Sequence, residues 1–288
     1  MLPAMAARPR IAIVGPGRLG TTLAVELSQA GYPIAEVISR EAEGSRKKAC
    51  LLARRLRARA STVRTPHLDA NLIWFCVPDS QITSAARTLA RSTDWKEKIA
   101  FHSSGALASD ELYPLRRRGA AVAAVHPMMT FVSNSKPSLA GVPFALEGDR
   151  PAVRLARQIV YSLRASSFTI RKRDKAIYHA WGAFTSPLLV AAFITMEKVA
   201  QAAGLAPADA RRKMLPIVKQ TMRNYDRLGP AGAFSGPLIR GDVGTVRQHL
   251  RTLKRVRGAA DIYVALARAA LLYLPVAQRQ KLQRILKP

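Results

Sequence analysis

The first half of the chain alternates short apolar runs with stretches whose apolar residues recur at helical spacing. The apolar runs, which predict strands, lie at residues 10–14, 34–38, 71–77, 98–102, 120–126 and 142–146. Between them, residues 21–30 and 44–60 have the spacing of amphipathic helices. Strands that alternate with helices are typical of a parallel sheet covered by helices. We therefore expect residues 1–165 to form a doubly wound, mostly parallel α/β domain of the Rossmann type.

The pattern changes after residue 149, where helical spacing takes over. A helix at 151–163 and a last strand at 167–170 are followed by predicted helices at 175–203, 207–228 and 243–256 and by two more at the end. Asp242 is the predicted N-cap of the helix at 243–256, and residues 229–241 are a loop rich in Gly and Pro. We expect residues 166–288 to form an all-α second domain.

Length and composition fit a soluble protein with two domains. The chain has 288 residues and two cysteines, which are too few for a disulfide framework or a metal-thiolate site. Its longest apolar stretch, at 181–196, is too short to span a bilayer and resembles a buried helix. The first ten residues lack the apolar region of a signal peptide. We therefore predict a cytoplasmic protein without a membrane span or a metal.

The net charge of +28 raises the question of an anionic partner. The basic residues are mostly Arg and are spread along the chain, in short clusters without interleaved aromatic residues. This distribution favours an Arg-rich solvated surface over a nucleic-acid-binding patch. Attraction of a phosphorylated cofactor or an acidic substrate stays open.

A glycine motif follows the first strand and opens the first helix. It fits G-x-G-x-x-G and consists of Gly15, Pro16, Gly17, Arg18, Leu19 and Gly20. Gly15 permits the tight turn, Gly17 lets the backbone approach a pyrophosphate, and Gly20 lets the helix pack closely on the strand. The helix N-terminus then favours an anion. In this context the motif predicts a dinucleotide site.

The end of the second strand distinguishes NADP from NAD. An acidic residue there would bind the ribose hydroxyls, but this chain has Ser39 and Arg40. A hydroxyl and a guanidinium suit a 2′-phosphate, because Arg binds phosphate through a charge-assisted fork. We expect NADP, with NAD less favoured.

Polar residues follow three further strands at the same expected edge of the sheet. Val77, Pro78 and Asp79 close one strand and are expected to line the cofactor groove, although Asp79 could equally cap a helix. A second strand leads to Ser103, Ser104 and Gly105, candidates for binding the nicotinamide or the substrate. A third leads to His126, a candidate polar group near the reacting carbon, though such a His is often structural.

At this point a family resemblance is visible. It rests on the stretches IAIVGPGRLG, FCVPDSQI, FHSSGALASDEL, HPMMTF, KAIYHAWGAF and FSGPLIRGDVGTV. In their order these resemble the Rossmann-like oxidoreductases whose C-terminal domain is catalogued as domain of unknown function 2520. That group is similar in build to pyrroline-5-carboxylate reductase, ketopantoate reductase and the β-hydroxyacid dehydrogenases. The resemblance implies a dimeric NADP-linked reductase or dehydrogenase without a settled substrate.

The resemblance also gives a mechanistic expectation. Lys175 and His179 are four residues apart and share a helix face. The hydroxyacid and ketopantoate enzymes carry Lys-x-x-x-Asn on the corresponding helix, where the Lys acts as acid or base on the substrate oxygen. Lys175 matches that pattern and His179 departs from it, which leaves the proton donor open between them. By the same resemblance the loop holding Arg240 closes over the active site, where Arg240 would clamp a substrate carboxylate or simply belong to a tight loop.

Three functions compete. The first is an enzyme that moves a hydride between NADP and a carbonyl or imine carbon of a small, anionic substrate. The second is a non-catalytic NADP-binding sensor or scaffold, and the third is a nucleic-acid-binding protein. A deazaflavin cofactor in place of NADP also stays possible. We expect the first, in a homodimer formed through the helical domain.

Overall fold

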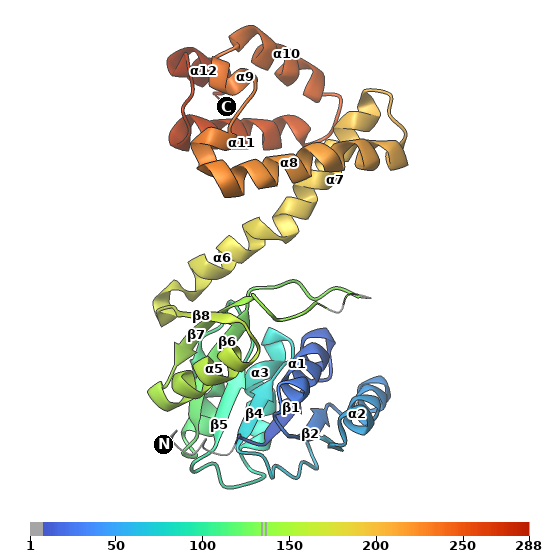
Figure 1. Ribbon diagram of the computed structural model, residues 1–288, viewed down its shortest axis with the longest axis vertical. Coiled ribbons are helices and arrows are strands. Elements are labelled where there is room, and N and C mark those ends of the chain that lie inside the picture. The colour runs from blue at the N-terminus through green and yellow to red at the C-terminus, as the bar shows by residue number, and fades with distance from the viewer. Residues whose placement is uncertain (1–7, 134, 136, 288) are drawn as a thin grey trace. The chain divides into compact units, whose positions relative to one another are not determined.

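One sheet runs through the N-terminal half in the order β3-β2-β1-β4-β5-β6-β7-β8 (Figure 1). Its strands are β1 (Ile11–Val14), β2 (Ile34–Ser39), β3 (Arg59–Thr62), β4 (Leu72–Phe75), β5 (Ile99–His102), β6 (Ala121–Pro127), β7 (Pro143–Gly148) and β8 (Ser166–Thr169). The β6–β7 pair is antiparallel and the other pairs are parallel. The computed structural model describes residues 8–133, 135 and 137–287. The predicted doubly wound α/β fold is confirmed.

Helices cover both faces of this sheet because its central strands are apolar on both sides. The side chains of Ile11 and Ile13 pack with helices α1 (Arg18–Gln29), α2 (Glu43–Leu56) and α5 (Arg150–Ser162). Those of Ala12 and Val14 pack on the other face, with α3 (Asp79–Leu89), η1 (Ser109–Leu112) and α4 (Tyr113–Arg116). Burial on both faces explains why the strands appear as continuous apolar runs rather than alternating ones.

Strand β3 is the main departure from the prediction in this half. The helix expected at 44–60 ends at Leu56, where Arg57 adopts a left-handed conformation with φ of 54°. Residues 59–62 then turn back and pair with β2 in parallel. The prediction missed this strand because the apolar residues of α2 and of residues 57–60 have the same helical spacing.

The chain divides into two compact units, Met1–Ala183 and Phe184–Pro288. The predicted boundary at 165/166 falls inside the first unit, because β8 pairs with β7 and the sheet extends beyond that point. The elements that follow β8 are η2 (Lys172–Asp174), α6 (Lys175–Thr185), α7 (Pro187–Ala202), α8 (Pro207–Ala233), α9 (Pro237–Arg240), α10 (Val243–Leu253), α11 (Ala259–Tyr273) and α12 (Arg279–Ile285). The C-terminal region is helical, as expected.

Two breaks in the helices differ from the prediction. The helix expected at 175–203 is two helices, because Ser186, which precedes Pro187, leaves the helical conformation with φ of −133°. Helix α8 is broken at Gly229, which has φ of 69°, and helical structure resumes after it as far as Ala233. Part of the expected loop at 229–241 is therefore helical. Short helix α9 occupies residues 237–240 of that loop.

The apolar stretch at 181–196 is exposed rather than buried, contrary to the prediction. Trp181 is 51% exposed, and on α7 Leu188 is 50% and Val190 62% exposed. The core of the second unit lies elsewhere, where α10, α11 and α12 bring Val246, Leu271 and Leu282 together. The segment Lys172–Ala202 is also long and apolar enough to cross a membrane by length and composition alone. An interface helix would have the same property.

Candidate active site

The glycine motif has the geometry expected for a dinucleotide loop. Gly15 has φ of 100°, and a Cβ atom there would lie 2.8 Å from the carbonyl oxygen of Cys76. A Cβ on Gly20 would collide with the carbonyl oxygen of Gly15. Gly17 instead opens outward, with no described atom within 4 Å of its Cβ position, and is the N-cap of α1 without a side-chain cap. The N-terminus of α1 is therefore open to an anion.

The rest of the motif supports this loop. Leu19 packs against the core beneath it. The Arg18 guanidinium donates to the carbonyl oxygen of Phe131 at 3.2 Å, so the cation is held above the loop. Pro16, Gly17 and Arg18 line a cavity of about 720 Å³ that extends along α1 and α2. This cavity gives the loop room for a ligand of nucleotide size.

Arg40 and Ser39 follow β2 but have different surroundings. The Ser39 side chain is buried, and its hydroxyl donates to the carbonyl oxygens of Arg40 and Ser61 at 3.0 and 3.4 Å. Arg40 is exposed, and its Nε donates to Ser45 Oγ at 2.9 Å. Among the described residues no carboxylate pairs with Arg40. The exposed guanidinium and Ser45, rather than Ser39, face outward where an anion could bind.

At the end of β4, Val77 and Pro78 lead directly into α3. Pro78 is the N-cap residue and Asp79 the first residue of the helix, where a carboxylate is favoured by the helix dipole. Asp79 does not cap the helix with its side chain. Its Oδ2 accepts a hydrogen bond from Ser104 Oγ at 2.9 Å, which joins the β4 edge to the β5 edge.

Ser103 and Ser104 follow β5 and are both held by the protein. The Ser103 hydroxyl accepts a hydrogen bond from the indole N–H of Trp74 at 2.8 Å. The Ser104 hydroxyl, besides donating to Asp79, accepts from the backbone N–H of Leu107 at 2.9 Å. The backbone N–H of Ser104 donates to His102 Nδ1 at 3.1 Å. Ser104 is thus the centre of a rigid polar network.

Lys175, the first residue of α6, joins this network. It is only 3% exposed, and its Nζ donates to the Ser104 carbonyl oxygen at 2.9 Å. Burial lowers the pKa of Lys175 to about 8, while the nearby carboxylates of Glu147 and Asp79 oppose that shift. A buried ammonium group with a pKa close to neutrality is a typical catalytic arrangement.

Tyr178 is a site residue that the sequence analysis missed. Its Oη lies 2.6 Å from His126 Nδ1, and the two rings meet edge to face. Burial lowers the pKa of His126 to about 4, with further contributions from Lys175, His179 and His102, and it raises the pKa of Tyr178 to about 12. The available signal was the spacing of three between Lys175 and Tyr178, which places both on the buried side of α6.

Gly105 allows two histidines to meet beside this network. A Cβ atom on Gly105 would lie 2.8 Å from His126 Nε2 and 2.9 Å from His179 Cδ2. The missing side chain therefore lets both imidazole rings lie close against the Gly105 backbone. The structure thus brings together five residues that the sequence analysis named as site candidates, and their roles stay predictions: Ser104, Gly105, His126, Lys175 and His179.

Arg240 lies in the second unit, at the end of α9. Its guanidinium pairs with the Asp242 carboxylate, with Nε and Nη2 at 2.9 and 2.8 Å from Oδ2. Asp242 is the N-cap residue of α10, as predicted, but its side chain makes no capping hydrogen bond. The carboxylate is used to hold Arg240.

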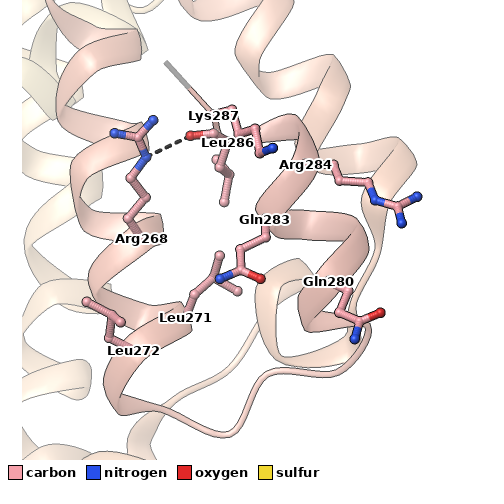
Figure 2. A pocket seen from close by; sticks show the side chains of 8 residues that line it. All are labelled: Arg268, Leu271, Leu272, Gln280, Gln283, Arg284, Leu286 and Lys287. Atoms are coloured by element: carbon pink, nitrogen blue, oxygen red, sulfur yellow. Dashed lines mark hydrogen bonds between the residues drawn. The ribbon is translucent and has the colours of Figure 1, made fainter.

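The second unit also has a cavity of about 640 Å³ between α11 and α12 (Figure 2). Leu271 and Gln283 point into it, while the Arg284 guanidinium points away. Arg268 Nε donates to the Leu286 carbonyl oxygen at 2.7 Å. None of the predicted site residues lines this cavity. The described part of the chain contains no cluster of His, Cys, Asp and Glu suited to a metal.

Solved structures show that the whole fold is shared with several oxidoreductases. A Bacteroides fragilis protein provisionally named an NADP oxidoreductase is 23% identical, with a TM-score of 0.74 over 91% of this chain and 97% of that one. A reductive aminase from Aspergillus terreus, solved with NADPH and ethyl-5-oxohexanoate, is 16% identical, with a TM-score of 0.67 over 96% and 99%. A pyrroline-5-carboxylate reductase from Coxiella burnetii is 14% identical, with a TM-score of 0.59 over 91% and 98%.

Sequence comparisons identify the two parts of the chain. A search of curated protein sequences gave no match. Residues 4–127 match the profile of a Rossmann-like domain, and residues 142–270 match that of a domain of unknown function, DUF2520. The chain is therefore similar to a Rossmann-like domain in its N-terminal part and to a DUF2520 domain in the part that follows.

Proposed function

We propose that this protein is an NADP-dependent reductase that acts on a carbonyl or imine carbon of a small substrate. The observation that carries the proposal is the polar cluster of Lys175, His126 and Tyr178 around Ser104 and Gly105. Ser104, Gly105 and His126 lie at the carboxyl ends of β5 and β6, which are parallel to the β1 strand that leads into the glycine loop, and such ends form the usual ligand edge of a sheet. Lys175 and Tyr178 reach these residues from α6.

The residues of the loop fit a dinucleotide. Gly17 leaves its Cβ position open, and the uncapped N-terminus of α1 offers N–H groups to a pyrophosphate. A bound nicotinamide would supply the hydride, while the protein supplies orientation and a proton. The solved relative from Aspergillus terreus contains NADPH, which supports the same cofactor here.

The surroundings of Arg40 support NADP over NAD. Its guanidinium is exposed, has no described acidic partner and lies beside the Ser45 hydroxyl. A 2′-phosphate would receive a charge-assisted fork from such a group. Ser39, with its hydroxyl turned inward, would contribute by shaping the backbone rather than by contact.

Lys175 is the residue best suited to stabilise charge during the reaction. Hydride addition to a carbonyl carbon leaves negative charge on oxygen, which a preorganised cation stabilises in a water-poor site. The bond from Nζ to the Ser104 carbonyl oxygen fixes the ammonium group and leaves other N–H bonds for a substrate. His179 lies one turn further along α6, and its ring lies close against Gly105.

Exposed apolar side chains support a homodimer formed through the second unit. On α8 Ile217 and Met222 are exposed, and on α11 Leu266 and Leu272 are exposed, in addition to those on α7. Surfaces of this kind commonly mark an interface. We place such a dimer in a reducing compartment such as the cytoplasm, because Cys50 and Cys76 are both free.

Titration with NADPH and NADH tests the cofactor assignment. It shows whether the protein binds either nucleotide and which one it binds more tightly. We expect NADPH to bind about tenfold or more tightly than NADH, and Arg40→Asp to weaken NADPH binding by roughly 1–3 kcal/mol. Intrinsic fluorescence quenching gives both affinities. Equal affinities would contradict the assignment, and tight binding without turnover of any carbonyl or imine would favour the sensor or scaffold.

A further inference from the structure

His102, the last residue of β5, is a buried histidine to which the proposed function gives no role. Its side chain is 0% exposed, and both ring nitrogens are hydrogen-bonded. The backbone N–H of Ser104 donates to Nδ1 at 3.1 Å, and Nε2 lies 2.9 Å from the carbonyl oxygen of Ala108. A backbone N–H can only donate and a carbonyl oxygen can only accept. Nδ1 therefore carries no proton, and Nε2 carries one.

Burial keeps this imidazole neutral. Burial lowers the pKa of His102 to about 4, while its hydrogen bond to Ala108 opposes that shift; the charge of Lys175 lowers the pKa further and that of Asp79 raises it. If the ring were charged, Nδ1 would carry a proton directed at the Ser104 N–H, and this hydrogen bond would be lost. At neutral pH the ring therefore joins the two ends of the turn formed by residues 103–108.

The two ends of this turn are also held by other parts of the sheet. At its start, the indole N–H of Trp74 donates to Ser103 Oγ at 2.8 Å. Directly after its end, the backbone N–H and the hydroxyl of Ser109 donate to the Glu147 carboxylate at 2.7 and 2.9 Å. The turn is thus anchored to β4 and β7, and His102 connects its ends from β5.

Ser104 is the residue of the turn that reaches Lys175. Its backbone N–H donates to His102, and its hydroxyl donates to Asp79 and accepts from the Leu107 N–H. Its carbonyl oxygen accepts from Lys175 Nζ at 2.9 Å. A residue has only two soft backbone torsions, so holding the N–H and the side chain of Ser104 restricts the direction of its carbonyl group.

Charged and titratable groups from several elements surround the Lys175 ammonium. Asp79 on α3 and Glu147 on β7 contribute negative charge, and each is bound by a serine in or next to the turn. His102 on β5 and His126 on β6 also interact with the ammonium, and the pKa of each is lowered to about 4. Both imidazoles are therefore neutral at pH 7. The surroundings of Lys175 thus depend on the geometry of this turn.

We propose that His102 is a positioning residue for Lys175: as a neutral imidazole protonated on Nε2, it fixes the turn at residues 103–108, so that the Ser104 carbonyl group holds the ammonium in place. His102 is fully buried, so it acts through Ser104 and not by contact with a ligand. The consequence for turnover rests on the proposed reductase function, whereas the tautomer and its effect on Lys175 do not.

Nitrogen NMR of the histidine rings tests the tautomer in the wild-type protein, without substrate or cofactor. The chain has five histidines, and the His102 signals are identified by their loss in His102→Asn. We expect a neutral ring protonated on Nε2 at pH 7, which becomes charged only near pH 4. A ring protonated on Nδ1, or a charged ring at pH 7, would overturn the proposal.

Exchange of the Lys175 ammonium protons with water measures how firmly this group is held. NMR at pH 6 observes the charged form, since the pKa is about 8, and Lys175→Arg identifies the signal by its loss. We expect slow exchange in the wild type, because the side chain is 3% exposed and bonded to Ser104. His102→Leu removes the acceptor for the Ser104 N–H and should speed the exchange about tenfold. Unchanged exchange in this variant would overturn the proposal.

Two conservative variants separate the two hydrogen bonds of the imidazole. His102→Asn places an amide oxygen near the position of Nδ1, so exchange at Lys175 should stay within about threefold of the wild type. His102→Gln places an amide N–H near the position of Nε2 but leaves the Ser104 N–H without its acceptor, so exchange should be faster than in His102→Asn. The reverse order would contradict the proposed role of the Nδ1 bond, even if His102→Leu does not fold.

Leu89 on α3 provides a control for overall stability, because its side chain is 0% exposed and belongs to the core on one face of the sheet. Leu89→Ala should lower the melting temperature by leaving a cavity, while exchange at Lys175 stays as in the wild type. If Leu89→Ala speeded this exchange as much as His102→Leu, the exchange would report on general stability and the proposal would fail.

Turnover separates this proposal from the reductase function. For a substrate that the wild type reduces, His102→Leu should lower kcat by about 10–100-fold, since misplacing a reacting group by about 1 Å has an effect of this size. KM for NADPH should change little, and His102→Asn should retain most of the turnover. Equal kcat in the wild type and His102→Leu would overturn the positioning role and leave the reductase function intact. If no substrate is reduced, the reductase function fails, and exchange at Lys175 decides the role of His102.

Discussion

Lys175 combines burial with a positive charge, and its chemistry gives the sharpest prediction at the level of single residues. Because its pKa is about 8, the ammonium form is lost as the pH rises through that value. Turnover that depends on the cation should therefore fall above pH 8. Lys175→Arg, which keeps the charge, should retain partial turnover without that fall. A pH–rate profile with NADPH held saturating measures both.

Removal of the ammonium group has a defined cost. Lys175→Ala should leave NADPH affinity nearly unchanged and lower turnover by about 10²–10⁴-fold, the range expected for a lost acid or charge-stabilising group. His179→Asn should be milder, because His179 is exposed and lies against Gly105 outside the hydrogen bond between Lys175 and Ser104. Unchanged turnover in Lys175→Ala would remove Lys175 from the mechanism.

Single residues also show which parts of the candidate site could be predicted from the sequence. The roles of Gly15, Gly17 and Gly20 follow from one motif because each answers a local backbone constraint. Tyr178 could not be identified in that way, since its partner His126 comes from a strand 52 positions away. The hydroxyl of Ser39 donates to backbone carbonyl oxygens in the fold, which the sequence could not show, because the direction of a hydroxyl at a strand end depends on its neighbours.

At the level of elements, the turn from β1 into α1 contains two glycines with different expected roles. Gly17 is expected to contact the ligand, and Gly20 packs against the protein backbone. Gly17→Ala adds a methyl group in open space, so the fold should keep its melting temperature while NADPH affinity falls about tenfold or more. Gly20→Ala forces a methyl group against the Gly15 carbonyl, so it should lower the free energy of unfolding by roughly 1–3 kcal/mol. The melting temperature should fall accordingly. Thermal melts with and without NADPH distinguish the two effects, and equal destabilisation by both variants would contradict this division.

The elements that the sequence predicted well are those with strong local signals. Strands β1, β4, β5 and β6 are buried on both faces and appear as apolar runs. Strand β3 is half exposed, polar and directly follows α2, so its pairing with β2 leaves little trace in the sequence. The break at Ser186 depends on a single proline in an apolar segment, where hydrophobic spacing continues unchanged.

At the scale of the whole molecule, the exposed apolar helices predict assembly. Val190 and Ile194 on α7 would be covered by a second copy in a homodimer. One chain has a mass of 31.4 kDa. Light scattering at micromolar concentration should therefore give twice that mass. Val190→Glu should shift the protein toward monomers, while Leu51→Glu, at a position on α2 that is also exposed, should not. A monomeric wild type would contradict the prediction.

The central claim is that this fold transfers a hydride from NADPH to a small substrate. The most direct measurement uses NADPH deuterated at the transferring carbon, incubated with the wild-type protein and a panel of carbonyls and imines, with mass spectrometry of the products. We predict that deuterium appears on the former carbonyl or imine carbon of at least one product, and that Lys175→Ala largely abolishes its transfer. Tight NADPH binding without deuterium in any product would contradict the claim and indicate a sensor or scaffold.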